Sequence, residues 1–250
     1  MPGGSTDGSG GRSRRERLRA DTVEEIKHAA LGLIVERGAA NLRFTDIARS
    51  MGMTPPALYR YFADRDELLT ALVADSYDSL SDALTVTRET VPRDDLDGRF
   101  VATCTGYRTW AQRNPERFAL IFGSPVPGYA APPDGPTVAA GRRAMEHMAE
   151  LVADTAERGR LGSPLVPDAA EALKLAWATV HGFVTLEAYG HFHTLDQEAR
   201  DRLFAVQAGV AARTAGLAPA VDQGGDQGPS GRGPWLGRRG PRRPLALGPR

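Results

Sequence analysis

The stretch FTDIARSMGMTPPALYRYF, Phe44–Phe62, decides the fold of this chain because it predicts two short helices joined by a turn. Gly52 stands where a tight turn needs a positive φ, which glycine adopts without strain. Thr54 is placed as the N-cap of the second helix, and Pro55 fits the first turn, where no backbone donor is missed. This arrangement is typical of a helix-turn-helix, whose second helix enters the major groove of DNA.

The second of these helices is predicted to have one buried and one exposed side. Leu58 and Phe62 lie four residues apart and form the buried stripe. The other side chains are mostly small or aromatic, so base readout would rest on methyl contacts more than on bidentate hydrogen bonds. These candidate DNA contacts are Thr54, Pro55, Pro56, Ala57, Tyr59, Arg60 and Tyr61.

Residues 20–80 resemble the DNA-binding domain of the TetR family of transcriptional regulators, and the string ALYRYF at 57–62 is close to that family's most recognisable motif. The resemblance implies an all-α protein with a helix-turn-helix DNA-binding domain at 14–80, in which the motif itself occupies 43–62. A helical domain for effector binding and dimerisation would follow at 81–215.

The resemblance also implies roles for individual side chains. Tyr59 would contact a phosphate or a thymine methyl, and Tyr61 and Arg65 would contact phosphates. The family usually has Thr or Ser at the position of Arg43, where it caps a helix, and often Arg at the position of Thr45; here the two types are reversed. Either Thr45 caps a helix that begins two residues late, or the cap is weak. We expect Arg43 and Thr45 to lie at the DNA, Thr45 against a phosphate.

The net charge of zero conceals an asymmetry along the chain. Residues 12–66 carry 11 basic and 8 acidic side chains, a net +3, and residues 221–250 carry 6 and 2, a net +4. Residues 67–220 carry 14 and 20, a net −6. Positive charge therefore accompanies the helix-turn-helix and the C-terminal tail, where phosphates would be met, while DNA would repel the middle of the chain.

The composition restricts the class of protein. The single cysteine, Cys104, excludes an intramolecular disulfide and a cysteine zinc cluster. The N-terminus lacks the apolar core of a signal peptide, and the charge-free stretch 175–186 has 12 residues, where a bilayer needs about 20. We therefore expect a cytoplasmic protein with no membrane partner. We find no Gly-rich phosphate loop, Cys–His pair or carboxylate dyad, so we expect neither an enzyme nor a cofactor.

Apolar spacing and breakers predict about nine helices and two tails. Residues 1–13 are Gly/Ser-rich and residues 216–250 are Gly/Pro/Arg-rich, so both are predicted to be disordered. Between the first tail and the first helix, Arg14, Arg15 and Arg17 would form a basic arm that reaches phosphates. Besides the two helices of the motif, we expect helices at 23–37, 64–84, 100–112, 115–122, 137–158, 168–189 and 196–214.

The helix at 168–189 is apolar nearly all round, so it must be covered on two sides. The helical domain can cover one side, and a second subunit would cover the other. Paired with the helix at 196–214, it would meet its two-fold copy in a four-helix bundle, the usual way to form a dimer. An ordinary buried core helix is the alternative. The expected homodimer contacts are Leu175, Leu186, Leu203, Val206 and Val210.

Aromatic residues gather in the second half of the chain, which resembles a TetR subgroup named for a Trp-His-Gly motif, here Trp177, His181 and Gly182. They predict an effector pocket with apolar walls and a few polar groups. Core packing alone also explains most buried aromatic residues, and a histidine on an apolar face is more often a hydrogen-bonded core residue. The candidate pocket residues are Tyr107, Trp110, Phe118, Phe122, Trp177, His181 and Phe183.

A metal site is not expected, although His191 and His193 invite comparison with His181. Imidazole suits zinc, but no acidic or cysteine partner is placed with them. The expected partners are double-stranded operator DNA, a second copy of the chain and an unknown small-molecule effector. We expect a ligand-responsive homodimeric repressor; a dimeric DNA-binding protein without an effector and an enzyme that uses the helical pocket remain the alternatives.

The expected mechanism is mechanical. The helix at 64–84 links the DNA-reading end to the pocket, so a ligand that shifts this helix would change the distance between the two recognition helices. On DNA these helices must sit about 34–36 Å apart. A small apolar ligand that favours another separation would release the operator by linkage.

Overall fold

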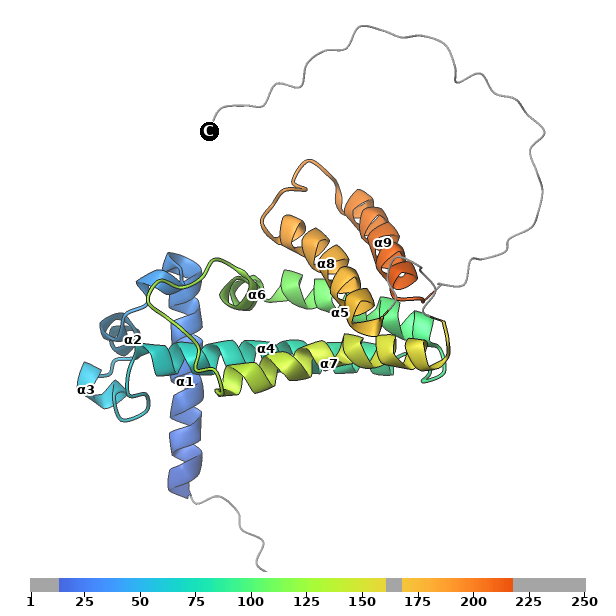
Figure 1. Cartoon of the computed structure of the whole chain (residues 1–250). Helices are drawn as coiled ribbons and strands as arrows, with labels where there is room; N and C mark the ends of the chain where they lie inside the picture. The colour runs from blue at the N-terminus through green and yellow to red at the C-terminus, as the bar shows by residue number, and fades with distance from the viewer. Residues whose placement is uncertain (1–13, 161–167, 218–250) are drawn as a thin grey trace, which may run out of the picture. The chain divides into compact units, whose positions relative to one another are not determined.

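The computed structural model describes residues 14–160 and 168–217, and the regular structure in these ranges is entirely helical (Figure 1). This confirms the all-α fold predicted from the sequence. The elements are α1 (Arg14–Arg37), the 3-10 helix η1 (Ala39–Asn41), α2 (Phe44–Ser50), α3 (Pro55–Leu58), α4 (Arg65–Glu89), α5 (Leu96–Arg113), α6 (Pro115–Phe122), α7 (Pro136–Glu157), α8 (Ala169–Ala188) and α9 (Gln197–Thr214).

Three helices begin at the aspartates that the sequence marks as starts. The carboxylates of Asp64, Asp168 and Asp196 accept hydrogen bonds from backbone N–H groups three residues on, at 2.8, 2.8 and 2.7 Å. Each aspartate has extended backbone at the N-cap of its helix and satisfies one of the donors that a helix end leaves open. The long helices α4, α8 and α9 therefore begin at well-defined positions.

Helix α1 begins nine residues before the predicted start at Val23. The segment RRERLRA at 14–20 consists of strong helix formers, but it is exposed and has no apolar periodicity to reveal it. Arg14, Arg15 and Arg17 are consequently helical residues rather than an extended arm. The first turns of α1 project beyond the neighbouring helices in Figure 1.

The helix-turn-helix differs from prediction at both of its helices. Helix α2 begins at Phe44, and Arg43 occupies its N-cap without a side-chain hydrogen bond. Thr45 therefore lies inside the helix and does not cap it, so the alternative of a weak cap applies. Helix α3 ends at Leu58 instead of continuing to Phe62. Thr54 occupies its N-cap without a side-chain hydrogen bond. The residues after Leu58 form a turn, in which the Tyr61 N–H donates to the Leu58 carbonyl at 2.9 Å.

The buried apolar residues divide into two clusters. The first core joins α1, α2, α3 and the start of α4, and includes Ile26, Ile47, Leu58 and Leu68, each with no exposed surface. The second core joins the rest of α4 to α5–α9. Within the described ranges both cores belong to one compact unit, so the boundary at residue 80 stays a prediction.

Helix α4 contributes to both cores, with Leu72 in the first and Leu80 and Leu84 in the second. Beyond the first core it packs along α7, and the two helices run side by side in Figure 1. A second connection comes from α6 and the loop after it, because Leu120 and Val126 pack against the first core. Two separate segments therefore link the cores.

Helices α8 and α9 pack against each other (Figure 1). The residues directly after α9 terminate this helix. Gly216 has a φ of 72°, and the N–H of Leu217 donates to the Ala212 carbonyl at 2.7 Å. Leu217 is fully buried, so the predicted tail begins after it rather than at Gly216. The predicted disorder at 1–13 and 218–250 lies outside the described residues.

Candidate nucleic-acid interface and candidate ligand cavity

The turn and short helix after α2 present one aromatic side chain to solvent. Tyr59 is 55% exposed, whereas its neighbour Leu58 has no exposed surface. The Tyr59 ring lies 5.0 Å from the buried Phe44 ring, centroid to centroid, which fixes its position on the surface. Gly52 has a φ of 66° in the turn, as the sequence predicts.

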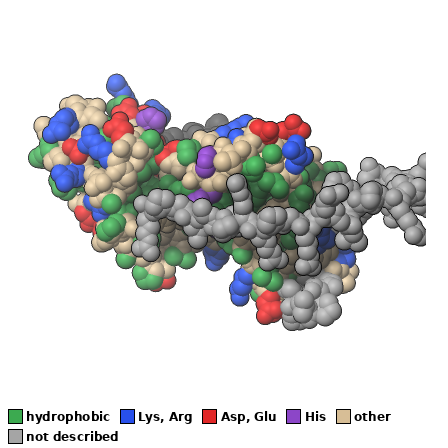
Figure 2. All heavy atoms as spheres, turned by 90° about the horizontal axis from the view of Figure 1, so that it is seen from above, with side chains coloured by type: hydrophobic (Ala, Val, Ile, Leu, Met, Phe, Trp, Pro, Cys, Tyr) green, Lys and Arg blue, Asp and Glu red, His purple; other side chains and the backbone are tan. Residues whose placement is uncertain are grey.

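The predicted DNA contacts are largely brought together on this surface. Ala57 and Tyr61 are half-buried, and the others of the motif are exposed. Figure 2 shows Lys and Arg side chains, with some acidic ones between them, over the end of the molecule formed by α1–α3. The exposed members are Arg43, Thr45, Thr54, Pro55, Pro56, Tyr59 and Arg60.

Arg65 has a structural position that the sequence did not reveal. Its guanidinium donates to the carbonyl oxygens of Ala39 and Ala40 at 2.9 and 3.4 Å, which ties the start of α4 to η1. The two carbonyls thus accept hydrogen bonds from the guanidinium that the resemblance places against a phosphate. Tyr61 is also engaged, since the Arg19 guanidinium lies 5.2 Å from the centre of its ring and donates to the Arg60 carbonyl at 3.0 Å.

Five of the predicted pocket residues form one aromatic cluster between α5, α6 and α8. The Trp177 and His181 rings stack with centroids 4.9 Å apart and an interplanar angle of 18°. Phe122 lies 4.9 Å from His181, and Phe118 lies 5.3 Å from Phe122. Tyr107 completes the cluster at 5.1 Å from Trp177.

The polar atoms of Tyr107 and His181 have partners within the protein. The Tyr107 hydroxyl and His181 Nδ1 are 2.7 Å apart, and His181 Nε2 lies 3.3 Å from the Thr185 hydroxyl. Burial lowers the pKa of His181 and raises the pKa of Tyr107 well above its usual range. His181 therefore has the bonding of a core histidine.

Trp110 and Phe183 lie outside the cluster. The Trp110 indole donates to the Ser79 hydroxyl on α4 at 3.1 Å, and the ring is buried. Phe183 packs instead against Phe204 on α9, with ring centroids 5.3 Å apart. For Phe183 the sequence does not show this, because helical spacing alone does not separate the faces of α8, which is apolar nearly all round. Trp110 lies on α5, and its spacing does not reveal that it faces α4.

The face of α8 that carries Phe183 also holds a buried charge network. The Arg108 guanidinium donates to both carboxylate oxygens of Glu187 at 2.6 Å and to Asp201 at 2.7 Å. Arg108 on α5 is thus connected to α8 through Glu187 and to α9 through Asp201. The hydrogen bonds to Glu187, and then that to Asp201, raise the pKa of Arg108. The hydrogen bond from Arg108 lowers the pKa of Asp201.

A cavity of about 180 Å³ lies beside the aromatic cluster. Its walls come from Leu84 on α4, Tyr107 on α5, Met145 and Met148 on α7, and Trp177 on α8. Only Tyr107 and Trp177 of the predicted pocket residues reach it. The methionines were missed because nothing in their spacing distinguishes a cavity wall from packed core.

All five residues predicted for the dimer contact are exposed in the single chain. Val206 is 63% exposed and Leu175 is 48% exposed, although large apolar side chains are usually covered. They lie on α8 and α9, the two helices that form a pair in Figure 1. The complete set is Leu175, Leu186, Leu203, Val206 and Val210.

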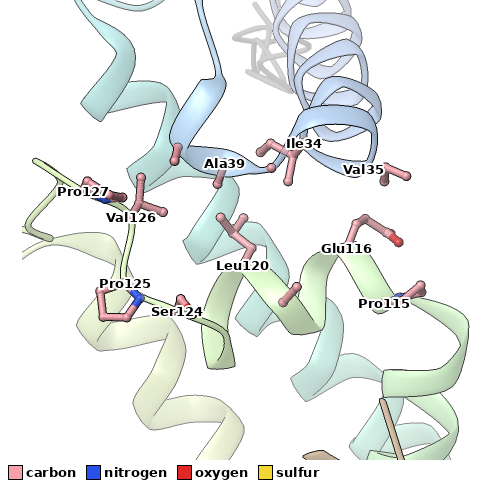
Figure 3. A pocket seen from close by; sticks show the side chains of 13 residues that line it. Ile34, Val35, Ala39, Pro115, Glu116, Leu120, Ser124, Pro125, Val126 and Pro127 are labelled. Carbon is pink, nitrogen blue, oxygen red and sulfur yellow. The ribbon is translucent and has the colours of Figure 1, made fainter. Parts of the chain in front are cut away.

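A further cleft of about 600 Å³ lies between the first core and α6, and no pattern in the sequence predicts it. Ile34 and Val35 of α1 form one wall, and Leu120 of α6 with Val126 of the following loop forms the other (Figure 3). Glu116, in the first turn of α6, points toward this cleft.

The described ranges lack both a cluster of metal ligands and a helix that could span a membrane. No group of three or more His, Cys, Asp or Glu side chains is arranged there to hold a metal ion. Within the same residues, each helix falls short of the length or apolar character that crossing a bilayer requires.

Two family models match the chain, and they divide it as the two cores do. Residues 26–72 match the model for bacterial regulatory proteins of the tetR family. Residues 100–210 match the model for a tetracyclin repressor-like C-terminal domain. The first range covers the helix-turn-helix, and the second covers the aromatic cluster and most of α9.

An HTH-type transcriptional regulator of Mycobacterium tuberculosis is 43% identical over 123 residues, which are 49% of this chain and 51% of the relative. The chain thus matches about half the length of such curated relatives. A second regulator of that organism, uncharacterized, is 26% identical over 76% of this chain and 82% of its own.

Solved structures extend the similarity to the full fold. The structure of a candidate regulatory protein, SCO4313, has a TM-score of 0.66 and 32% identity, over 80% of this chain and 98% of that one. A protein of unknown function from Rhodococcus sp. RHA1 has a TM-score of 0.65 and 26% identity, over 86% and 100%. With helix-turn-helix, helical domain and both family models in agreement, the chain belongs to the TetR family of bacterial transcriptional regulators.

Proposed function

We propose that the protein is a homodimeric repressor that binds a pseudo-palindromic operator and releases it when a small apolar effector binds. The observation that carries the dimer is the exposed stripe of five large apolar side chains on α8 and α9. An exposed apolar stripe on a helix pair is the surface that a two-fold copy would cover. A dimer of this kind would present two recognition helices to two half-sites.

Tyr59 supports the DNA-binding part of the proposal. It stands exposed at the C-cap of α3, a short helix that Leu58 holds to the first core, and Arg60 and Thr54 are exposed as well. The hydroxyl would meet a phosphate, and the ring would meet a thymine methyl. The fully buried Leu58 anchors the same helix, so the surface would keep its shape in the absence of DNA.

The operator test uses Tyr59→Ala and Tyr59→Phe in a binding titration against a pseudo-palindromic duplex. We expect Tyr59→Ala to abolish specific binding and Tyr59→Phe to retain the part that depends on the ring. Sedimentation should show that both variants remain dimers, because α8 and α9 are untouched. Near-normal affinity of Tyr59→Ala would remove α3 from the recognition role, and a monomer at micromolar concentration would overturn the dimer.

The cavity beside Trp177 supports the effector part. Its volume of about 180 Å³ resembles that of apolar cavities of about 150 Å³ that hold benzene, so a monocyclic apolar ligand would fit. Leu84 gives α4 a place in the wall, and α4 also carries Leu68 and Leu72 of the first core. A ligand that moves α4 would therefore act on the DNA-reading end, provided that it binds the released state more tightly.

The effector test compares Met145→Phe, which fills the cavity, with Val138→Phe, an exposed position on the same helix α7. Monocyclic aromatic compounds are first screened by thermal shift on the full chain. A compound that raises the melting temperature should release the operator from wild type and from Val138→Phe, but not from Met145→Phe. Equal response of both variants would place the effector elsewhere, and a screen without a hit would favour the effector-free alternative.

A further inference from the structure

The cleft between the first core and α6 has the lining of a binding site for a charged amphiphile. Its volume of about 600 Å³ lies within the range of about 300–1,000 Å³ that is usual for small-molecule sites. Ile34 and Val35 of α1 supply one apolar wall, and Leu120 of α6 with Val126 of the loop after it supplies the other. A ligand body would therefore be held between the first core and the helical domain, and not within either.

Among the described residues that line this cleft, Glu116 is the only charged one. It is half-buried in the first turn of α6, with Leu120 one turn further along the same helix. Figure 3 shows both side chains on the α6 side of the cleft, with Ile34 and Val35 facing them across the gap. A negative charge is thus set at the edge of an otherwise apolar surface.

This carboxylate has no protein partner among the residues that the structure describes. Other glutamates that face neighbouring helices are paired; Glu187 binds Arg108 at 2.6 Å and Glu150 binds Arg88 at 2.8 Å. Within the described ranges, Glu116 forms neither an ion pair nor a hydrogen bond. A half-buried carboxylate beside apolar walls attracts a cation more strongly than one in bulk water, because the local dielectric constant is lower.

From these observations we propose that the cleft is a site for a small lipophilic cation, whose apolar body lies against Leu120 and Val126 and whose positive charge lies at Glu116. A neutral compound would gain only the apolar contacts. An anion would be repelled by Glu116 and would find no cationic side chain among the described residues of the lining. This site is separate from the cavity beside Trp177, since no residue lines both.

The test measures ligand binding to the full chain by calorimetric titration in the absence of DNA, so its outcome is independent of the proposed repressor function. The probes are tetraphenylphosphonium, a lipophilic monocation, and triphenylphosphine oxide, a neutral compound with a similar aromatic body. We expect one cation site per chain, with an affinity at least about tenfold higher than for the neutral probe, since about 1.4 kcal/mol of charge pairing gives that ratio.

Three variants locate the site. Glu116→Gln should lower the affinity for the cation about tenfold and leave the neutral probe unchanged. Asp134→Asn, which removes an exposed charge from the loop after α6 outside the lining, is the matched control and should change neither affinity. Ala119→Phe, at an exposed lining position of α6, should weaken both probes by filling the cleft.

Thermal melting of each variant checks that the fold is retained. If Ala119→Phe lowers the melting temperature markedly, Ala119→Leu replaces it with a smaller side chain. The proposal is overturned if the cation does not bind up to its solubility limit, if both probes bind wild type equally, or if Glu116→Gln binds the cation as wild type does. Loss of binding in Met145→Phe, with Ala119→Phe unaffected, would move the cation to the other cavity and overturn the proposal too.

Discussion

The helix-turn-helix surface and the aromatic cluster of the helical domain use the same residue types in opposite ways. Tyr59 is 55% exposed, whereas Tyr107 is 1% exposed and bonds to His181. In the first region, a large exposed side chain outside the apolar stripe stands out as a candidate DNA contact. In the second region, the proposed ligand site and the packing involve the same buried rings, so residue type does not separate the two roles.

The largest expected effect tests whether buried polar groups hold the second region together. Arg108→Met leaves Glu187 buried without its partner, because the side chain of Glu187 is only 7% exposed. Breaking a buried pair from one side costs about 3–5 kcal/mol of unfolding free energy. Urea unfolding of the variant measures this loss.

Arg202→Met is the matched control on α9, since its pair with Glu198 joins side chains that are 64% and 85% exposed. This variant should change stability by less than about 0.5 kcal/mol. The double variant Arg108→Met with Glu187→Leu should recover much of the loss, because no buried charge remains unpaired. Equal losses for Arg108→Met and Arg202→Met would refute the role of burial.

A pair of glycines tests the two regions at equal strain. Gly52 in the helix-turn-helix and Gly159 after α7 both have a φ of 66°, and a Cβ added to either meets no atom within 4 Å. Alanine at either position should cost about 1–2 kcal/mol of unfolding free energy, measured by urea unfolding. Only Gly52→Ala should also weaken operator binding, because only that turn orients α3. A similar fall in DNA affinity for Gly159→Ala would show that strain spreads between the regions.

Acid should act through the second region. Burial lowers the pKa of His181, and burial, followed by the charge of Arg88, lowers the pKa of His147. The unfolded chain then binds more protons than the folded one between the lowered values and the usual value of about 6.5. Stability should therefore be greatest above that value and fall as the pH decreases through it.

Urea midpoints between pH 7.5 and 5.5 measure this dependence. His181→Gln and His147→Gln should each flatten the decline, and the double variant should flatten it further. The Gln side chain can still bond to Tyr107, so His181→Gln should keep operator binding at pH 7.5. An unchanged slope in the double variant would assign the acid sensitivity to other groups.

The sequence predicted helices best where an apolar stripe and a cap coincide. The starts of α4, α8 and α9 at Asp64, Asp168 and Asp196 are confirmed because each aspartate has one local function. The first turns of α1 were missed because an exposed polar helix leaves no apolar period. The early end of α3 was missed because the stripe of Leu58 and Phe62 continues through the turn that follows.

The site was predictable only in part, for a related reason. Exposure of the motif residues follows from local helix geometry, and most of the predicted DNA contacts are exposed, while their role at DNA stays a prediction. The separation of Phe183 from Trp177 depends on which helix covers each face of α8, and that is a long-range property. The hydrogen bonds from Arg65 to the carbonyls of η1 were not predictable for the same reason, because Ala39 and Ala40 are distant in sequence, and its phosphate contact stays a prediction.

The smallest expected effect concerns the arginines at the start of α1. Because they are helical, Arg14 and Arg17 lie on one face of the helix, three residues apart, while Arg15 points to another side. Replacing Arg14 and Arg17 together by Gln should reduce the salt slope of operator binding by about 0.9 per lost phosphate contact, and Arg15→Gln should change it less. Arg142→Gln, on the exposed surface of α7 in the acidic region, is the control and should leave the slope unchanged.

The measurement is operator affinity across a range of salt concentrations. If the double variant keeps the wild-type slope, the N-terminal turns of α1 do not touch DNA, and the basic character of the first region acts only through the helix-turn-helix. If Arg15→Gln lowers the slope as much as the pair does, the segment is an extended arm on DNA, because a helix cannot direct all three side chains toward the same phosphates.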